Sequence, residues 1–119
     1  MKMQTHYMSL LKSPFEKMQS GQKTVEIRLN EPKRQMLKLG DKIIFSKLDD
    51  LDQKLQAKVV KLLKFRTFSE LLEQVPMQKF GYEPEHDKTL MLNRIYTIYS
   101  KQQEQEHGIL AIELEFNCS

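Results

Sequence analysis

Apolar and polar residues alternate in several segments of this chain, and alternation with a period of two is typical of β-strands that bury one face. The clearest case is residues 109–116, where large apolar residues occupy the even positions and glutamates occupy positions 113 and 115. Similar patterns elsewhere, bounded by turn residues, predict five strands in total. These are Lys2–Leu10, Lys23–Leu29, Lys42–Ser46, Lys54–Phe65 and Ile109–Phe116.

Short helices are predicted between the strands from capping residues and helical spacing of apolar positions. Ser13 and Pro14 are expected to begin the first helix, which Gly21 ends. Thr67, followed three residues later by Glu70, has the spacing of a capping box. Residues 90–99 fit helical spacing but also contain residues with β-propensity, and we predict helix because the polar segment 101–107 that follows is helix-compatible and ends in a glycine. The predicted helices cover residues 13–21, 32–40, 67–76 and 90–99.

About five strands with interspersed helices indicate an α+β fold with a curved, mostly antiparallel sheet of five or six strands. A length of 119 residues is enough for one core, so residues 1–119 are expected to form a single domain. The polar residues 48–52 predict a hairpin turn within the sheet. Periodicity alone does not distinguish a barrel from an open sheet.

Composition excludes several classes of protein. No apolar run approaches the roughly 20 residues that span a bilayer, and the first residues lack the apolar core of a signal peptide. The single cysteine, Cys118, has no partner for an internal disulfide, so a reducing cytoplasm is the expected location. The three histidines are far apart in sequence and show no zinc-ligand spacing. We therefore expect no membrane, metal or cofactor.

Positive charge is concentrated in the first part of the chain. Residues 1–47 hold ten lysines and arginines against four acidic residues, whereas residues 48–119 hold nine against twelve. This asymmetry favours an anionic partner that approaches the basic half. The alternative is that these lysines are only a solvated surface, since lysines alone are weak evidence for nucleic-acid binding.

The segment Gly21–Arg28 carries the strongest candidate site. Because side chains alternate along a strand, Glu26 and Arg28 point to one face and the apolar Val25 and Ile27 to the other. Lys23 shares the apolar face unless it lies in the turn before the strand. Arginine offers a planar fork of donors for phosphate or carboxylate, and glutamate accepts from amines or hydroxyls. The alternative is that Glu26 and Arg28 only pair with each other.

The motif Gly-x-Lys-x-x-Glu-x-Arg at residues 21–28 resembles the ASCH domain family, and several other segments support the resemblance in the same order. No single motif is specific, but the combination spans nearly the whole chain. The supporting segments are His6, Ser13–Phe15, Leu39–Phe45, Phe65–Phe68, Tyr99–Ser100 and Gly108–Ile112.

The resemblance implies a PUA-like β-barrel that binds RNA, nucleotides or nucleosides, with enzymatic activity in some members. It directs attention to Lys23, which could act as a base or activate a nucleophile. Tyr99 could stack on a base and Ser100 could bond to a phosphate, although such tyrosines also pack helices onto a barrel. The expected ligand-binding residues are Lys23, Glu26, Arg28, Lys33, Arg34, Tyr99 and Ser100.

One branch of this family, the N4-acetylcytidine amidohydrolases, has the pattern Gly-x-Lys-Thr-x-Thr-x-Arg. The chain is similar at Gly21, Lys23, Thr24 and Arg28, but Glu26 stands where that branch has its nucleophilic threonine. Two interpretations follow. The chain is a binding module for RNA or a nucleotide, or it is a small hydrolase of a modified nucleoside or of RNA in which Lys23 and Glu26 are catalytic.

Overall fold

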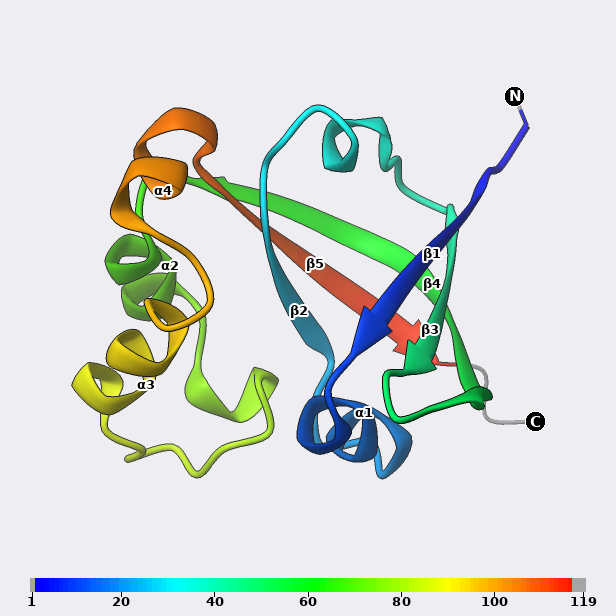
Figure 1. The fold of residues 1–119 in the computed structure, drawn as a ribbon, viewed down its shortest axis with the longest axis horizontal. Helices are drawn as coiled ribbons and strands as arrows, with labels where there is room; N and C mark the ends of the chain where they lie inside the picture. Colours follow the sequence, from blue (N-terminus) through cyan, green and yellow to red (C-terminus); the bar gives the residue numbers. More distant parts are fainter. Residues whose placement is uncertain (1, 117–119) are drawn as a thin grey trace.

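Five strands form one strongly curled sheet in this computed structural model, which describes residues 2–116; Cys118 lies outside the described residues (Figure 1). The strands are β1 (Thr5–Leu10), β2 (Val25–Leu29), β3 (Lys42–Lys47), β4 (Asp50–Phe65) and β5 (Ile109–Phe116). The α-helices are α1 (Lys12–Gln19), α2 (Phe68–Gln74), α3 (Lys88–Ile95) and α4 (Lys101–His107), and two short 3₁₀ helices are η1 (Arg34–Met36) and η2 (Met77–Lys79). Among the described residues, no helix has the length and apolarity needed to cross a bilayer.

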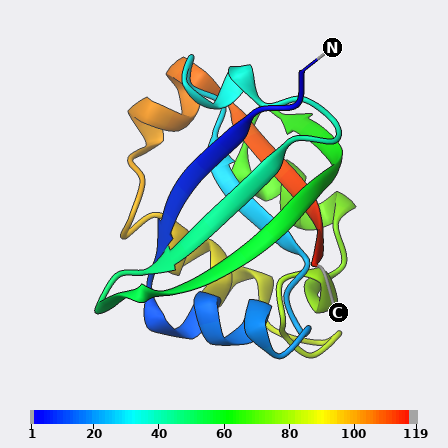
Figure 2. The ribbon, with the colours of Figure 1, turned by 90° about the vertical axis from the view of Figure 1, so that its right-hand side faces the viewer.

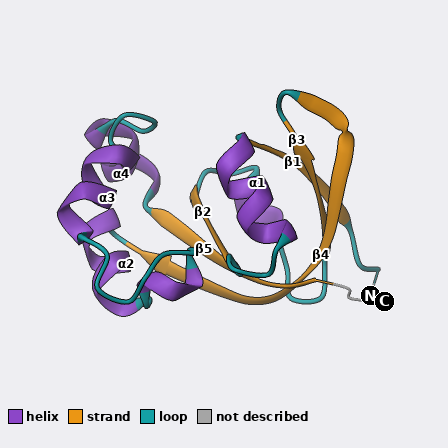
Figure 3. Ribbon diagram, turned by 90° about the horizontal axis from the view of Figure 1, so that it is seen from below, coloured by secondary structure: helices purple, strands orange, loops and turns teal. Residues whose placement is uncertain are grey.

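The sheet has the order β1-β3-β4-β5-β2, with β1 parallel to β3 and every other neighbouring pair antiparallel. This confirms the predicted α+β class and the mostly antiparallel curved sheet. β1, β3 and β4 run side by side in Figure 2, with β5 and β2 behind them. Viewed from below, the sheet curls around α1, whereas α2, α3 and α4 form a separate layer (Figure 3). β1 and β2 are the two end strands.

Two hydrophobic clusters lie on the two faces of the sheet. Inside the curl, residues of β1, β3, β4 and β5 pack against Phe15 and Met18 of α1. On the outer face, β2 and β5 pack against α2 and α3, with Phe68 and Leu71 completely buried. β5 separates the two clusters, because its alternating side chains place Leu110, Ile112 and Leu114 in the inner cluster and Ile109 and Ala111 in the outer one.

Thr67 is the N-cap of α2, as predicted, since its hydroxyl accepts from the Glu70 N–H at 3.1 Å. The prediction for Ser13 is wrong, because α1 begins at Lys12 and Leu11 occupies the capping position without a side-chain cap. Pro14 tolerates this shift because N–H groups anywhere in the first turn lack helical partners.

Residues 90–99 are not one helix. α3 ends at Ile95, and residues 96–99 form a turn that brings Ser100 to the start of α4. Two tertiary contacts favour the turn: the Tyr96 hydroxyl bonds to Glu104, and the Tyr99 ring stacks on Phe68 with centroids 5.7 Å apart. The apolar residues keep helical spacing up to residue 99, but α3 ends at Ile95 because the contacts of Tyr96 and Tyr99 favour a turn.

Glu104 joins the three outer helices from a buried position on α4. Its Oε2 accepts from the Phe68 N–H at the start of α2 at 2.7 Å, and both its oxygens accept from the Tyr96 hydroxyl after α3 at 2.8 and 2.9 Å. Burial raises the pKa of Tyr96 to about 12, and the hydrogen bond and charge of Glu104 act in the same direction.

We expect Glu104→Ala to lower the free energy of unfolding by about 2 kcal/mol, because it leaves the buried Phe68 N–H without a partner. Urea denaturation followed by circular dichroism measures this. Glu106→Ala, on the exposed side of the same helix, is the matched control and should change stability by less than about 0.5 kcal/mol. Equal losses in the two variants would contradict the role of Glu104.

Candidate functional site

Lys23 lies in the turn before β2 rather than inside the strand. Gly21 has a φ of 82°, a left-handed conformation that glycine adopts at little cost, and the N–H groups of Gln22 and Lys23 both donate to the Lys17 carbonyl. Lys23 then forms an isolated β-bridge with Phe80. The lysine is only 7% exposed, so it is fixed between α1 and the segment after η2.

Glu26 is the centre of a chain of charged contacts. Its Oε1 lies 3.4 Å from the Lys23 ammonium and accepts from the Ile27 N–H at 3.2 Å. Its Oε2 accepts from Arg28, with Nε at 2.9 Å and Nη2 at 2.8 Å. Glu26 is 6% exposed, so both carboxylate oxygens are occupied by protein donors in a buried position.

Arg28 connects the two ends of the sheet. Its Nη2 donates to the Ser9 carbonyl on β1 at 3.0 Å while the same guanidinium holds Glu26 on β2. Because β1 and β2 are the end strands, this contact crosses the seam where the curled sheet stays open. We refer to Lys23, Glu26 and Arg28 as the seam cluster.

The seam cluster also bonds to two backbone groups on the free edge of β2. The bonds from Leu114 N–H to the Thr24 carbonyl and from Asn30 N–H to the Gly108 carbonyl show that even-numbered residues of this segment bond to β5. Odd-numbered residues therefore face the open edge. There the Val25 carbonyl accepts a hydrogen bond from the Lys23 ammonium at 2.8 Å, and the Glu26 carboxylate accepts one from the Ile27 N–H at 3.2 Å.

The electrostatics of Glu26 follow from this geometry. Burial acts to raise the pKa of the carboxyl, but the positive charges of Lys23 and Arg28 and their hydrogen bonds outweigh burial and lower the pKa of Glu26 below its ordinary value. Glu26 is therefore held as a carboxylate at neutral pH, which suits an ion pair better than a general base.

Lys33 and Arg34 line a different feature, a groove of about 490 Å³ between β1 and η1, which we call the β1–η1 groove. The other lining residues are Gln4–Tyr7 and Met36. Neither this groove nor a larger one of about 760 Å³ beside α4 is lined by a residue of the seam cluster.

Arg34 nevertheless lies close enough to the seam cluster to interact with it. Burial lowers the pKa of the Arg34 guanidinium, and the positive charge of Arg28 adds to this effect, against the opposing charges of Glu31, Tyr99 and Glu26. The Arg34 Nε is buried without a hydrogen-bond partner, and its nearest carboxylate, on Glu31, is 4.0 Å away. Two guanidinium groups thus share one region with incomplete neutralisation.

Tyr99 lies in the same region, whereas Ser100 has a structural role. Burial raises the pKa of Tyr99, while Arg28 and Arg34 lower it and Glu26 and Glu31 raise it. One face of the Tyr99 ring is covered by Phe68. The Ser100 hydroxyl accepts from the Gln103 N–H at 3.1 Å, and Gln103 bonds back to the Ser100 N–H, which completes a capping box for α4.

A pair that sequence reasoning missed lies beside the groove. His6 Nε2 lies 2.9 Å from Asp41 Oδ2, which also accepts from the Lys38 N–H, while Asp41 Oδ1 accepts from the Gln4 N–H. Burial acts to raise the pKa of Asp41, but the hydrogen bonds from His6 and from these two N–H groups, with the His6 charge, lower it. The partners are 35 positions apart in the sequence and gave no local signal, so only the pairing of β1 with β3 brings them together.

The sequence model of the ASCH domain matches residues 8–117. Among solved structures, hypothetical protein PH0355 is 27% identical and superimposes with a TM-score of 0.81, over 95% of this chain and 99% of that one. Protein PF0455 from Pyrococcus furiosus is 25% identical, with a TM-score of 0.68 over 97% and 99%. No curated protein matches the chain significantly.

A more distant structure supports the fold alone. The ASCH protein from Zymomonas mobilis is 16% identical, with a TM-score of 0.56 over 92% of this chain and 65% of that one. These similarities agree with the PUA-like barrel that the resemblance implied. They assign no role to any residue of the seam cluster.

We expect Glu26→Gln to lower the free energy of unfolding at neutral pH by about 3 kcal/mol, because it leaves two buried cations with a neutral partner. The free energy of unfolding of the variant should also fall less steeply as the pH is lowered. A carboxyl whose pKa is lowered by folding stabilises the fold above its ordinary value near 4.5, and this contribution is lost as pH falls through the lower, folded pKa.

Urea denaturation at several pH values between about 7 and 3 measures both effects, with a shallower acid slope expected in the variant. Glu31→Gln is the control, since its carboxylate is 42% exposed and 4.0 Å from Arg34. An unchanged acid slope in Glu26→Gln would show that Glu26 does not carry the lowered pKa.

Proposed function

Because the chain belongs to the ASCH domain family, which is associated with RNA-binding and hydrolase-like roles, we propose that it binds RNA, or a nucleotide, through phosphate contacts in the β1–η1 groove. Arg34 and Lys33 contact the phosphate, and the positive charge of Arg28 at the seam adds to the attraction for the anion. In this proposal Glu26 and Lys23 fix Arg28 rather than touch the ligand. Tyr99 lies near the two arginines, outside the lining of the groove.

The Arg34 guanidinium, which lies near Arg28 and has a buried Nε without a hydrogen-bond partner, is the observation that carries this proposal. A buried guanidinium N–H without an acceptor costs free energy, and a second guanidinium nearby adds repulsion. An anion bound at the Arg34 guanidinium in the groove offsets the repulsion between the two arginines. Phosphate matches a guanidinium fork in geometry as well as charge, which makes it a better occupant than a halide or a single carbonyl.

The charge around the groove agrees with this choice. The groove and the adjoining seam cluster hold four cations, on Lys23, Arg28, Lys33 and Arg34, against three carboxylates, on Glu26, Glu31 and Asp41. The excess is positive, and it belongs to the half of the chain that carries the basic residues. Lys33 and Arg34 suit phosphate contacts, which carry no sequence information, so we expect backbone contacts rather than strong sequence preference.

The alternative of a small hydrolase that uses Lys23 and Glu26 is less well supported. Both oxygens of Glu26 already accept from protein donors, and its pKa is lowered, so it is a weak base. The Lys23 ammonium is bonded to the Val25 carbonyl and lies beside Glu26. These contacts satisfy the pair internally and favour a binding module.

We expect a fluorescein-labelled single-stranded RNA of about a dozen uridines to bind at low salt and to dissociate as salt rises, because phosphate contacts release counterions. Arg34→Gln should weaken binding by about 1–3 kcal/mol and reduce the salt slope by about one unit. Fluorescence anisotropy at several salt concentrations measures both quantities.

Lys88→Gln is the matched control, since it removes one charge from the exposed start of α3 and should leave the salt slope nearly unchanged. A phosphate-free nucleoside should compete poorly, whereas a nucleotide should compete if phosphate dominates. No binding at low salt, or equal binding by Arg34→Gln and the parent protein, would overturn the proposal.

We expect no acetate release from N4-acetylcytidine, because Glu26 stands in place of the threonine whose hydroxyl would form an acyl intermediate. The Glu26 carboxylate also adds negative charge where an oxyanion would form. Acetate detection during incubation with the purified protein checks this, with Glu26→Thr measured in parallel. Turnover by the parent protein that is lost in Lys23→Ala would instead establish the hydrolase alternative.

A further inference from the structure

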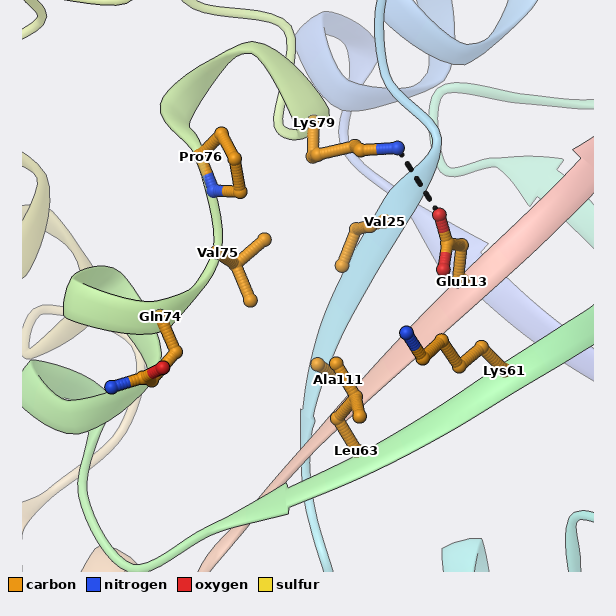
Figure 4. Close-up of a pocket in the computed structure, with 9 residues that line it drawn as sticks. All are labelled: Val25, Lys61, Leu63, Gln74, Val75, Pro76, Lys79, Ala111 and Glu113. Atoms are coloured by element: carbon orange, nitrogen blue, oxygen red, sulfur yellow. Dashed lines mark hydrogen bonds and ion pairs between the residues drawn. The ribbon is translucent and has the colours of Figure 1, made fainter.

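A second pocket lies on the opposite face of β2 from the Glu26 and Arg28 side chains, and the RNA proposal makes no use of it. It has a volume of about 200 Å³ and lies between the outer face of the sheet and the segment from α2 to η2 (Figure 4). Val25, Leu63, Val75 and Ala111 supply an apolar lining, and Pro76 lies at one wall. The charged residues at its rim come from three different segments.

A β-bulge in β4 places the Lys61 side chain on the pocket side of the sheet. Val59 pairs with Leu114 and faces the inner core, but Lys61 pairs with Glu113, so Val60 is an extra residue in β4. Without the bulge, the period of two would place Lys61 inside the curl beside Val59. The bulge instead puts Lys61, Glu113 and Val25 in one row across the outer face.

The rim has one cation more than it can neutralise. Lys79 donates to Glu113 Oε1 at 3.2 Å. Among the residues that the structure describes, Lys61 has no hydrogen-bond or ion-pair partner, and Figure 4 shows its ammonium on the pocket side of β4. Two lysines and one glutamate leave a charge of +1 above an apolar floor.

We propose that this pocket binds a small branched-chain monocarboxylate, with the carboxylate on Lys61 and the branched alkyl group on Val25, Val75 and Ala111. The single negative charge matches the excess at the rim. A volume of about 200 Å³ lies below the roughly 300–1,000 Å³ of pockets for drug-sized ligands, which restricts the occupant to a small molecule. The proposal is independent of RNA binding, because this pocket and the β1–η1 groove share no lining residue.

The experiment is a titration of the ¹⁵N-labelled protein with isovalerate, followed by amide chemical shifts. We expect saturable shifts at the amides of Val25, Val75 and Ala111, with affinity in the millimolar range. Isoamyl alcohol tests the apolar contact without the charge, and acetate tests the charge without the branched group. Each should bind at least about tenfold more weakly than isovalerate.

Lys61→Gln should weaken isovalerate binding by about tenfold, because it removes the charge while it keeps the stem of the side chain. Lys58→Gln is the matched control: Lys58 lies on the same strand opposite Glu115, outside the pocket, and its loss should leave the affinity unchanged. The amide spectrum of each variant reports whether it is folded. Equal binding of acetate, equal binding of isoamyl alcohol, unchanged affinity in Lys61→Gln, or no saturable shift would each overturn the proposal.

Discussion

A sheet that curls without closing leaves two strands with unpaired backbone edges, and the rest of this structure depends on how those edges are satisfied. β1 and β2 end the sheet, and side chains of the seam cluster bond to three of the backbone groups at these edges. Lys23 and Glu26 bond to the free edge of β2, and Arg28 crosses to the Ser9 carbonyl of β1. Each buried backbone group left unpaired would cost about 1–3 kcal/mol, a large part of the stability of a small domain.

This structural role limits the chemistry that the seam cluster can perform. A buried carboxylate between two cations is expensive to desolvate and is stable only while all its partners are present. Glu26 meets that condition, with a donor on every side and a lowered pKa. The group that remains available for a ligand is therefore the arginine just outside the cluster, Arg34, whose Nε has no acceptor. Structural and ligand-binding charges lie next to each other here but have different partners.

β2 also divides the molecule chemically. Its inner face carries Glu26 and Arg28 at the seam, while Val25 and Leu29 on its outer face pack against the helices. The helical layer is held by contacts of its own, chiefly the Glu104 carboxylate between α2 and the turn after α3. The bulge at Val60 then gives β4 a cation on the outer face without disturbing the inner core. The sheet therefore carries the paired charges of the seam cluster on its inner face and the Lys61 cation on its outer face.

The sequence by itself determined the features that depend on neighbours along the chain. The alternation in residues 109–116 predicted β5 with its observed bounds, the Thr67 cap formed as expected, and the strand period alone placed Glu26 and Arg28 on one face. It did not determine where α3 stops, because Tyr96 and Tyr99 end that helix through contacts with Glu104 and Phe68. Nor could it pair Arg28 with Ser9, His6 with Asp41 or Arg28 with Arg34. Those contacts depend on the order of strands in the sheet, and a local period of two or 3.6 residues contains no information about which strands become neighbours.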